Sequence, residues 1–473
     1  MNGYKYLFKN IGLLTLSSFA TKILVFFLVP LYTNILTTTE YGTYDLFNTT
    51  IGVLIPILTL NIQESVMRFS LEKKYSRNAI ITIGAKYLLI SNIIVIIGLE
   101  INSIFNISIL VKQYAIFFFL MYVTQSMSGI IISYIRGIDK IAELSVSSVI
   151  ASFVTIGLNI VFLAVFKWGL MGYFLANIVG PFFQCIYLIV KANVIKNINF
   201  HNNFNTEKKA MLSYCKPMIA NGVAWWDNTS DRYIVIFFCG LAENGVYSVA
   251  SKIPSILNIF QSIFNQAWTL SAVRDFDPED KNGFFANTYK AYNCMMVILC
   301  SFIIMFDKIL AKCLYANDFY IAWKYVPWLT IAGVFGAMSG YIGGFFSAVK
   351  DSRIFASSSI VGAISNIILN LILTPYIGAL GAAIATAVCY VEVWIFRYIQ
   401  SKKYIKLRIN IFRDIVTYVL ICIQATIIYV KSNYIYLLQC VLFVVIIILY
   451  ADDIKKIINK CTSKIRCKYK TKK

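Results

Sequence analysis

The sequence is poor in charged residues, which make up only 14% of its 473 positions. Soluble globular domains carry roughly 25% of them, so an ordinary cytosolic enzyme and a disordered chain are both excluded. Histidine occurs once, as His201, and no two of the 11 cysteines are spaced as C-x-x-C. Zinc clusters and histidine-based catalytic triads are therefore unsupported. The phosphate-binding loop G-x-x-x-x-G-K-[ST] is also absent, which excludes nucleotide hydrolysis by that route.

Apolar residues dominate instead, at 59% of the chain, and they form long runs. A helix needs about 20 mostly apolar residues to cross the hydrocarbon core of a membrane, so these runs predict an all-α integral membrane protein with about fourteen transmembrane helices. The first run is too long for the apolar region of a signal peptide. The predicted spans lie near 11–36, 43–66, 79–101, 113–135, 144–166, 169–190, 217–240, 246–270, 289–315, 325–349, 355–376, 379–400, 411–430 and 434–451.

The positions of the basic residues support this count. Lys and Arg total 43 against 22 Asp and Glu, which gives a net charge of +21. If the N-terminus is cytoplasmic, most of the basic residues fall in alternate, inner loops and tails, as membrane topology requires. This distribution predicts that both termini are cytoplasmic, and it explains the excess charge without a nucleic-acid partner. Exceptions that lie within predicted spans include Lys22, Lys86, Arg232 and Lys252, which we single out as candidates for function.

An internal repeat predicts how the spans are organised. Glu40-Tyr41-Gly42 opens the second span and Glu243-Asn244-Gly245 opens the eighth, while Gly169-x-x-Gly172 is matched by Gly378-x-x-Gly381. We therefore expect two parallel six-helix bundles, with a substrate site at their interface. The predicted domains are an N-terminal lobe at 1–190, a cytoplasmic linker at 191–216, a C-terminal lobe at 217–400, two additional transmembrane helices in 401–451 and a basic cytoplasmic tail at 452–473.

Polar side chains gather on the first, second, seventh and eighth predicted spans at helical spacing. Since polar groups are costly inside a bilayer, we interpret these stripes as the lining of a hydrated cavity. Asp227 and Asp231 are candidates for coupling transport to protons or sodium. The candidates for substrate binding are Lys22, Asp45, Asn48, Lys86, Arg232, Lys252 and Asn258.

Structural roles for the same residues stay open. Amides and hydroxyls also join helices to one another inside membranes. Lys22 has Asp45 or Asp227 as an alternative partner, and Arg232 has its neighbour Asp231. Lys86 and Lys252 lie near the ends of their spans, where long basic side chains reach the membrane surface.

Several motifs resemble those of a known family. They include Pro30-Leu31-Tyr32-Thr33, Glu40-Tyr41-Gly42 and Arg68-Phe69 in the first half, and Ser230-Asp231-Arg232 and Ala267-Trp268 in the second. With them, most of the chain resembles bacterial polysaccharide flippases of the Wzx type, in the multidrug/oligosaccharidyl-lipid/polysaccharide exporter superfamily. The resemblance implies two six-helix bundles that rock between inward-open and outward-open states in the bacterial inner (plasma) membrane.

The resemblance also implies a function. The substrate would be an undecaprenyl-diphosphate-linked oligosaccharide, moved from the cytoplasmic to the outer leaflet for a capsule, an exopolysaccharide or O-antigen. No catalytic residue, metal or cofactor is implied, and energy would come from a proton or sodium gradient or from removal of the product. The implied partners are the lipid-linked oligosaccharide, membrane lipids, a polysaccharide polymerase and glycosyltransferases.

Three other functions remain open. A cation-coupled drug or small-molecule antiporter of the same superfamily is one, although Lys22 and Arg232 favour an anionic substrate. A membrane polysaccharide polymerase would need catalytic groups, often on a large outer loop, and the longest predicted outer loop, near 308–324, contains no histidine. A peptidoglycan-precursor flippase differs from the favoured function only in its substrate.

Overall fold

The computed structural model describes residues 26–455, apart from 73, 203, 225–229 and 350. All regular structure in these residues is helical. The helices form two compact units. The first unit contains the described residues up to Ile236, together with Gly240–Val246 and Tyr315–Phe319. The second contains Phe237–Cys239, Tyr247–Leu314 and the described residues from Tyr320 onward.

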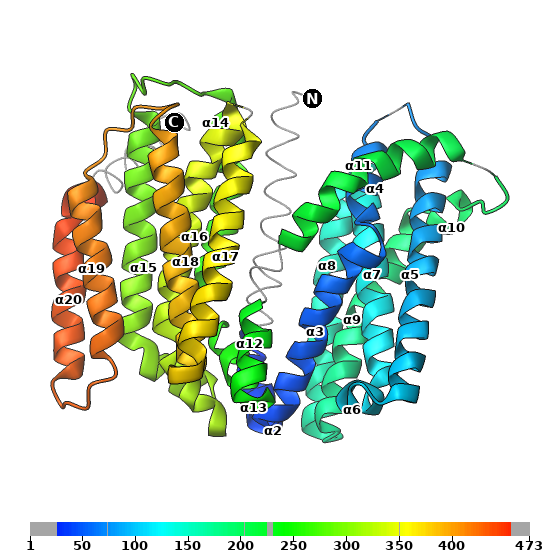
Figure 1. Ribbon diagram of the computed structural model, residues 1–473, viewed down its shortest axis with the longest axis horizontal. Coiled ribbons are helices and arrows are strands. Elements are labelled where there is room, and N and C mark those ends of the chain that lie inside the picture. Colours follow the sequence, from blue (N-terminus) through cyan, green and yellow to red (C-terminus); the bar gives the residue numbers. More distant parts are fainter. Residues whose placement is uncertain (1–25, 73, 203, 225–229, 350, 456–473) are drawn as a thin grey trace, which may run out of the picture. The chain divides into compact units, whose positions relative to one another are not determined.

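The first unit is built mainly from long helices that follow one another closely along the chain (Figure 1). A π-helical turn at Ile160–Val165 continues α8 before the chain turns back into α9. The helices are α2 (Val29–Ile35), α3 (Thr38–Leu58), α4 (Ile62–Ser70), α5 (Arg77–Phe105), α6 (Ile109–Gln113), α7 (Ala115–Gly137), α8 (Ile141–Asn159), α9 (Gly169–Lys191), α10 (Val194–Asn197) and α11 (Asn205–Ala224), followed by most of α12 (Ser230–Cys239) and the start of α13 (Leu241–Ala250).

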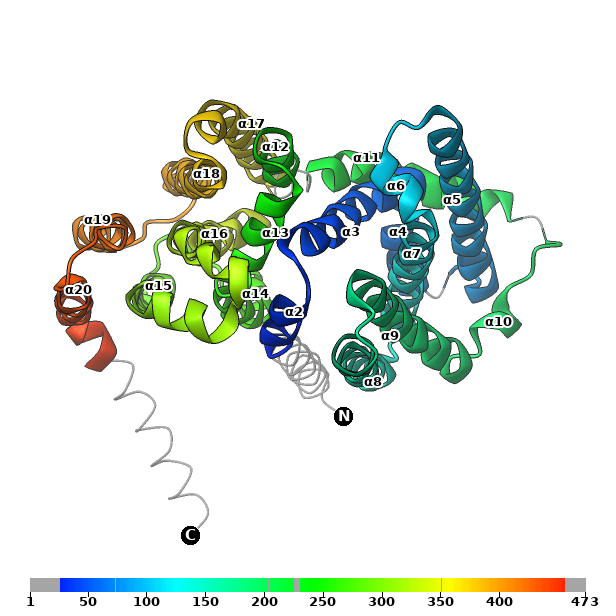
Figure 2. The same ribbon diagram turned by 90° about the horizontal axis from the view of Figure 1, so that it is seen from below.

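The second unit holds the remaining helices. Seen end-on in Figure 2, α19 and α20 lie at its edge, and both pack against α15. The helices are α14 (Ser255–Arg274), α15 (Phe284–Leu314), a 3-10 helix at Asn317–Lys324 that leads back into the unit, α16 (Val326–Ala348), α17 (Ser352–Ile377), α18 (Ala379–Ser401), α19 (Ile411–Ile427) and α20 (Ile435–Leu449).

The predicted multi-pass, all-α membrane fold is confirmed. Every predicted span after the first overlaps one of these helices, and the first lies mostly outside the described residues. Within the described part of the chain, 8 helices are long and apolar enough to cross a membrane, or 9 if α3 and α4 count as one bent span.

Within the described residues, the second and eighth predicted spans are broken rather than continuous. The second bends by 62° between α3 and α4, where Leu60 and Asn61 have positive φ angles of 54° and 52°. Left-handed residues cannot continue a right-handed helix, so α3 must end there. The eighth is interrupted at 251–254, and α14 begins directly after Pro254. A proline lacks the N–H that would continue the preceding helix.

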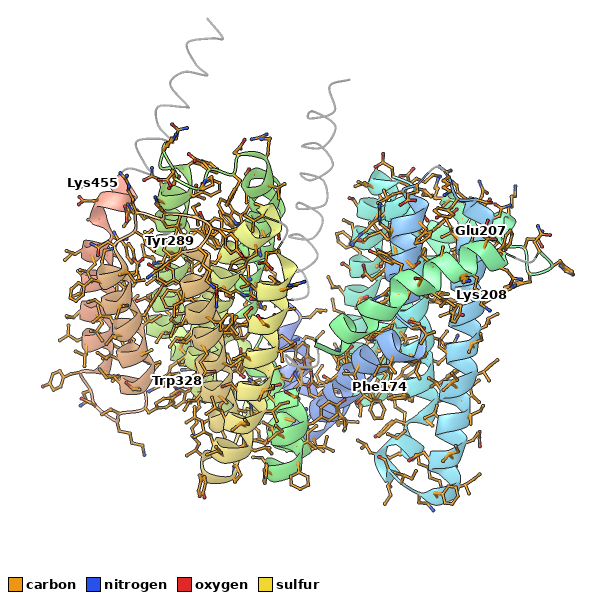
Figure 3. All side chains as sticks on the ribbon, turned by 45° about the horizontal axis from the view of Figure 1, so that its top comes forward. Phe174, Glu207, Lys208, Tyr289, Trp328 and Lys455 are labelled. Carbon is orange, nitrogen blue, oxygen red and sulfur yellow. The ribbon has the colours of Figure 1, made fainter. Side chains whose placement is uncertain are left out.

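The long helices carry apolar residues both on the faces that pack against other helices and on their exposed faces. In the first unit, α3, α5, α7 and α9 share a core that includes Phe47, Tyr122 and Phe174. Of these three, Phe174 is labelled in Figure 3. On the outer face of α5, Ile93 and Ile97 are 56% and 53% exposed. A soluble helix would present polar residues there, so this surface is suited to lipid.

Candidate functional site

The two copies of the Glu-x-Gly motif meet in the first unit. The start of α3 crosses the start of α13 (Figure 2), and the glycine of each copy lies in the contact. A Cβ atom at Gly42 would lie 2.0 Å from the carbonyl oxygen of Leu241, and one at Gly245 would lie 2.0 Å from that of Thr38. These are backbone clashes, so the crossing requires glycine at both positions.

A capping box determines where α3 begins. The Thr37 hydroxyl accepts a hydrogen bond from the Glu40 backbone N–H at 3.2 Å. In return, the Thr37 backbone N–H donates to the Glu40 carboxylate at 2.8 Å. Two N–H groups that the first turn leaves without helical partners are satisfied in this way. The cap and the glycine crossing together position the polar residues of the next turns of α3.

At this crossing lies an ion pair between Asp45 of α3 and Arg232 of α12. The Arg232 guanidinium also donates to the Thr49 hydroxyl at 3.1 Å. The Asn244 amide of α13 donates to the second carboxylate oxygen of Asp45 at 3.2 Å. The Asp45 side chain is only 7% exposed and that of Arg232 is 22% exposed. A buried charge without a partner is costly, so Asp45 and Arg232 each compensate the charge of the other.

Further polar contacts surround the pair. The Thr50 and Tyr233 hydroxyls share a hydrogen bond of 2.9 Å between α3 and α12. On another side of α3, the side-chain oxygen (Oδ1) of Asn48 accepts a hydrogen bond from the side-chain amide of Gln125 on α7 at 3.0 Å. We call Asp45, Thr49, Thr50, Arg232, Tyr233 and Asn244 the charged crossing. It combines one anion and one cation with amide and hydroxyl groups, which suits a ligand that carries both charge and hydroxyls.

The structure places the other predicted site residues as follows. Asp231 is buried, and its carboxylate accepts the backbone N–H of Arg232 at 2.9 Å. Lys86 is half-buried on α5. In the second unit, Lys252 is half-buried in the break before α14, and Asn258 is exposed on α14. Lys22 and Asp227 lie outside the described residues. The functional roles of all these residues remain predictions.

Two positions escaped the sequence analysis. Asn244 was visible as the centre of a repeated motif, but only the helix crossing brings it to Asp45. Arg397 falls inside the predicted span 379–400 but was not singled out, and the structure leaves it 5% exposed near the end of α18. Its guanidinium donates to the Ser358 and Ser359 hydroxyls at 2.9 and 3.1 Å and lies 4.2 Å from the Phe355 ring centroid. This set of partners holds α17 against α18.

Within the described part of the chain, no group of three or more His, Cys, Asp or Glu side chains is placed to hold a metal ion. The groups that the charged crossing offers to a ligand are charges and hydrogen-bond donors and acceptors. It can neutralise an anionic group through Arg232 and accept or donate hydrogen bonds through its hydroxyl and amide groups.

Comparison with solved structures shows that the fold is that of membrane transporters. A lipid II flippase, MurJ, in an inward closed conformation has a TM-score of 0.71 and 16% identity, and the match covers 93% of this chain and 99% of that one. An inward-facing multidrug resistance transporter of the MATE family has a TM-score of 0.63 and 14% identity over 82% and 95% of the two chains. A transporter from Pyrococcus furiosus, of the same MOP (multidrug/oligosaccharidyl-lipid/polysaccharide exporter) superfamily, has a TM-score of 0.54 and 14% identity, covering 84% and 94%.

A family model of polysaccharide biosynthesis proteins matches residues 7–269, more than half of the chain. The chain belongs to this family. None of the curated protein sequences matches it. The predicted polysaccharide biosynthesis family is confirmed, and the chain is a multi-pass membrane protein that shares the fold of these exporter-superfamily structures. The similar structures are transporters and flippases rather than enzymes.

Proposed function

We propose that this protein flips undecaprenyl-diphosphate-linked oligosaccharide from the cytoplasmic to the outer leaflet of the bacterial inner membrane, by alternating access and with both termini in the cytoplasm. The charged crossing is the observation that supports this function best. It places a cation, an anion and neutral polar groups within a membrane-spanning unit of a chain that belongs to a polysaccharide biosynthesis family. Charged groups inside a membrane usually mark a substrate or ion pathway.

In this proposal Arg232 exchanges partners during transport. Carboxylates and phosphates both match the planar guanidinium, so a diphosphate is a chemically equivalent replacement for Asp45. Arg232 is the more exposed member of the pair, at 22% against 7%, which suits a group that reaches toward a ligand. The amides and hydroxyls around it would bind sugar hydroxyls, while the lipid tail remains in the bilayer.

Energy would come from a proton or sodium gradient, with Asp227 and Asp231 as candidates for coupling, or from consumption of the product outside. No cofactor is part of this proposal. A polysaccharide polymerase would use the flipped repeat unit, and cytoplasmic glycosyltransferases would supply it. Lys22, Asn48, Lys86, Lys252 and Asn258 remain candidates for contacts with the sugar-phosphate head group.

Reconstitution tests the substrate directly. Purified full-length protein is placed in liposomes with a fluorescent undecaprenyl-diphosphate oligosaccharide, and a membrane-impermeant reductant reports the fraction in the outer leaflet. We expect exchange between leaflets with the native protein, strong loss with Arg232→Gln, and no loss with Arg68→Gln, whose side chain is 52% exposed. Exchange of lipid II alone would identify a peptidoglycan-precursor flippase, and uptake of organic cations alone would identify a drug antiporter; either result refutes the proposal.

A genetic test in cells complements reconstitution. A null mutant should lose its surface polysaccharide and accumulate the lipid-linked repeat unit on the cytoplasmic side. Normal surface polysaccharide without this accumulation would contradict export of the repeat unit.

A further inference from the structure

The second unit contains a carboxylate that the sequence analysis did not single out. Asp307 lies on α15, and its relative exposure is 0%. Both carboxylate oxygens are buried without a hydrogen-bond partner among the described residues. Asp307 also takes part in none of the ion pairs of the described residues. An isolated carboxylate in such a place needs an explanation, since burying it ionised costs several kcal/mol.

The other buried carboxylates of the described residues have partners. Asp45 pairs with Arg232, and both Asp414 and Asp453 pair with Arg413. The remaining two, Asp231 and Asp280, accept hydrogen bonds from backbone N–H groups. Each of these contacts stabilises the ionised form of an acid. Asp307 has no contact of this kind, so its neutral form is favoured.

The charged and titratable groups near Asp307 form no ion pair with it among the described residues. Lys308 follows it on α15 and interacts with it electrostatically, but the Lys308 ammonium donates to the Ile428 carbonyl at 2.8 Å and lies 4.5 Å from the Trp323 ring centroid. Tyr320 of the 3-10 helix and Tyr429 after α19 also interact electrostatically with Asp307. Neither phenol carries a positive charge. Neither α16 nor α20 carries a charged residue, and the charged residues of α19, Arg413 and Asp414, lie in its first turn, at the opposite end of that helix from Tyr429.

We propose that Asp307 is a proton-binding site and that its protonation favours the conformation described here. The carboxylate takes one proton from hydronium and releases one water molecule, so one O–H bond breaks, one forms, and nothing is oxidised or reduced. Any conformation that exposes Asp307 to water, or brings it a cation, would lower its proton affinity. By linkage, proton binding then biases the second unit toward the buried state and couples its movement to a pH gradient.

The position of Asp307 suits exchange with one side of the membrane. It is seven residues from the end of α15 at Leu314, or about 10 Å at the helical rise. The predicted topology places this end on the outer side. The coupling part of the inference rests on the proposed transport function, whereas the protonation of Asp307 does not.

Infrared spectroscopy of the purified full-length protein tests protonation independently of the substrate. At neutral pH we expect the native spectrum minus that of Asp307→Asn to show the C=O stretch of a protonated carboxylic acid. Asp318→Asn is the matched control, because Asp318 is an exposed carboxylate that follows α15. It should leave the band unchanged. A native spectrum that does not differ from that of Asp307→Asn in this band would mean that Asp307 is ionised, and the proposal would be wrong.

Transport in proteoliposomes tests the coupling. An imposed pH gradient should accelerate transport by the native protein, by Asp318→Asn and by Asp307→Glu, which keeps a titratable acid. The Asp307→Asn variant, which has the shape of the protonated acid and should fold, should lose this acceleration. Retention of the full acceleration, or stimulation of the native protein by sodium rather than protons, would overturn the coupling. If the native protein moves no lipid-linked oligosaccharide, the proposed function fails, while the infrared result still decides whether Asp307 binds a proton.

Discussion

The ion pair between Asp45 and Arg232 should be among the strongest polar interactions of the first unit. Polar contacts between membrane helices contribute about 0.6 kcal/mol on average in double-mutant cycles, and at most about 1.7 kcal/mol. Removal of one partner of a fully buried ion pair costs roughly 3–5 kcal/mol. This pair lies between those limits, because Asp45 is 7% exposed and Arg232 is 22% exposed. We therefore expect a coupling energy of about 2–3 kcal/mol.

A double-mutant cycle measures this energy. The free energy of unfolding is compared among the native protein, Asp45→Asn, Arg232→Gln and the double variant, in a mixed micelle where unfolding is reversible. Each single variant leaves one charge without its partner, whereas the double variant removes both charges. The double variant should consequently be less destabilised than the sum of the two single variants.

An exposed ion pair of the same unit provides the control. Arg68 and Glu72 are four residues apart on α4, with an N–O distance of 3.1 Å, and their side chains are 52% and 38% exposed. Exposed pairs at this spacing contribute about 0.3–0.5 kcal/mol. If the cycle on Asp45 and Arg232 gives no more than the control pair, burial does not strengthen the interaction and our reasoning about the charged crossing is wrong.

Three further predictions concern packing, a buried cation and pH. Gly42→Ala should lower the free energy of unfolding by about 1–3 kcal/mol, because the added Cβ clashes with the backbone at the start of α13. Gly52→Ala is the control and should not lower it, since the space around its Cβ position is open. Chemical denaturation measures both variants. Arg397→Lys should lower the free energy of unfolding by about 1–3 kcal/mol, because an ammonium cannot reproduce the hydrogen bonds of the planar guanidinium. An unchanged midpoint of thermal unfolding would contradict the role of Arg397 in holding α17 against α18. A hydrogen bond from the Tyr404 hydroxyl at 2.7 Å lowers the pKa of the half-buried Asp351 carboxyl. A carboxyl whose pKa is lowered by folding stabilises the folded state at pH values above its unfolded-state pKa, and this stabilisation is lost as the pH falls through the folded-state pKa. Tyr404→Phe should raise the pKa of Asp351. The melting temperature of this variant should therefore depend less on pH in the acid range.

The sequence alone was sufficient to predict the class and the approximate helices of the protein. Transfer of a helix from water to lipid depends on residues that are contiguous in the chain, so hydropathy and basic loops report it directly. The predicted spans at 79–101 and 169–190 accordingly fall within α5 and α9. Backbone breaks were less visible, since the bend after α3 depends on the left-handed conformation of Leu60 and Asn61.

The arrangement of the charges was decided only by the tertiary structure. Polar spacing drew attention to Asp45 and Arg232 separately, yet their pairing joins residues 187 positions apart. It depends on two glycines that let α3 and α13 approach closely. Burial is likewise a property of packing, because neighbours from distant helices determine whether a carboxylate such as Asp307 meets a cation, a backbone N–H or neither. Composition places such groups in the membrane, and only helix packing determines which partners surround them.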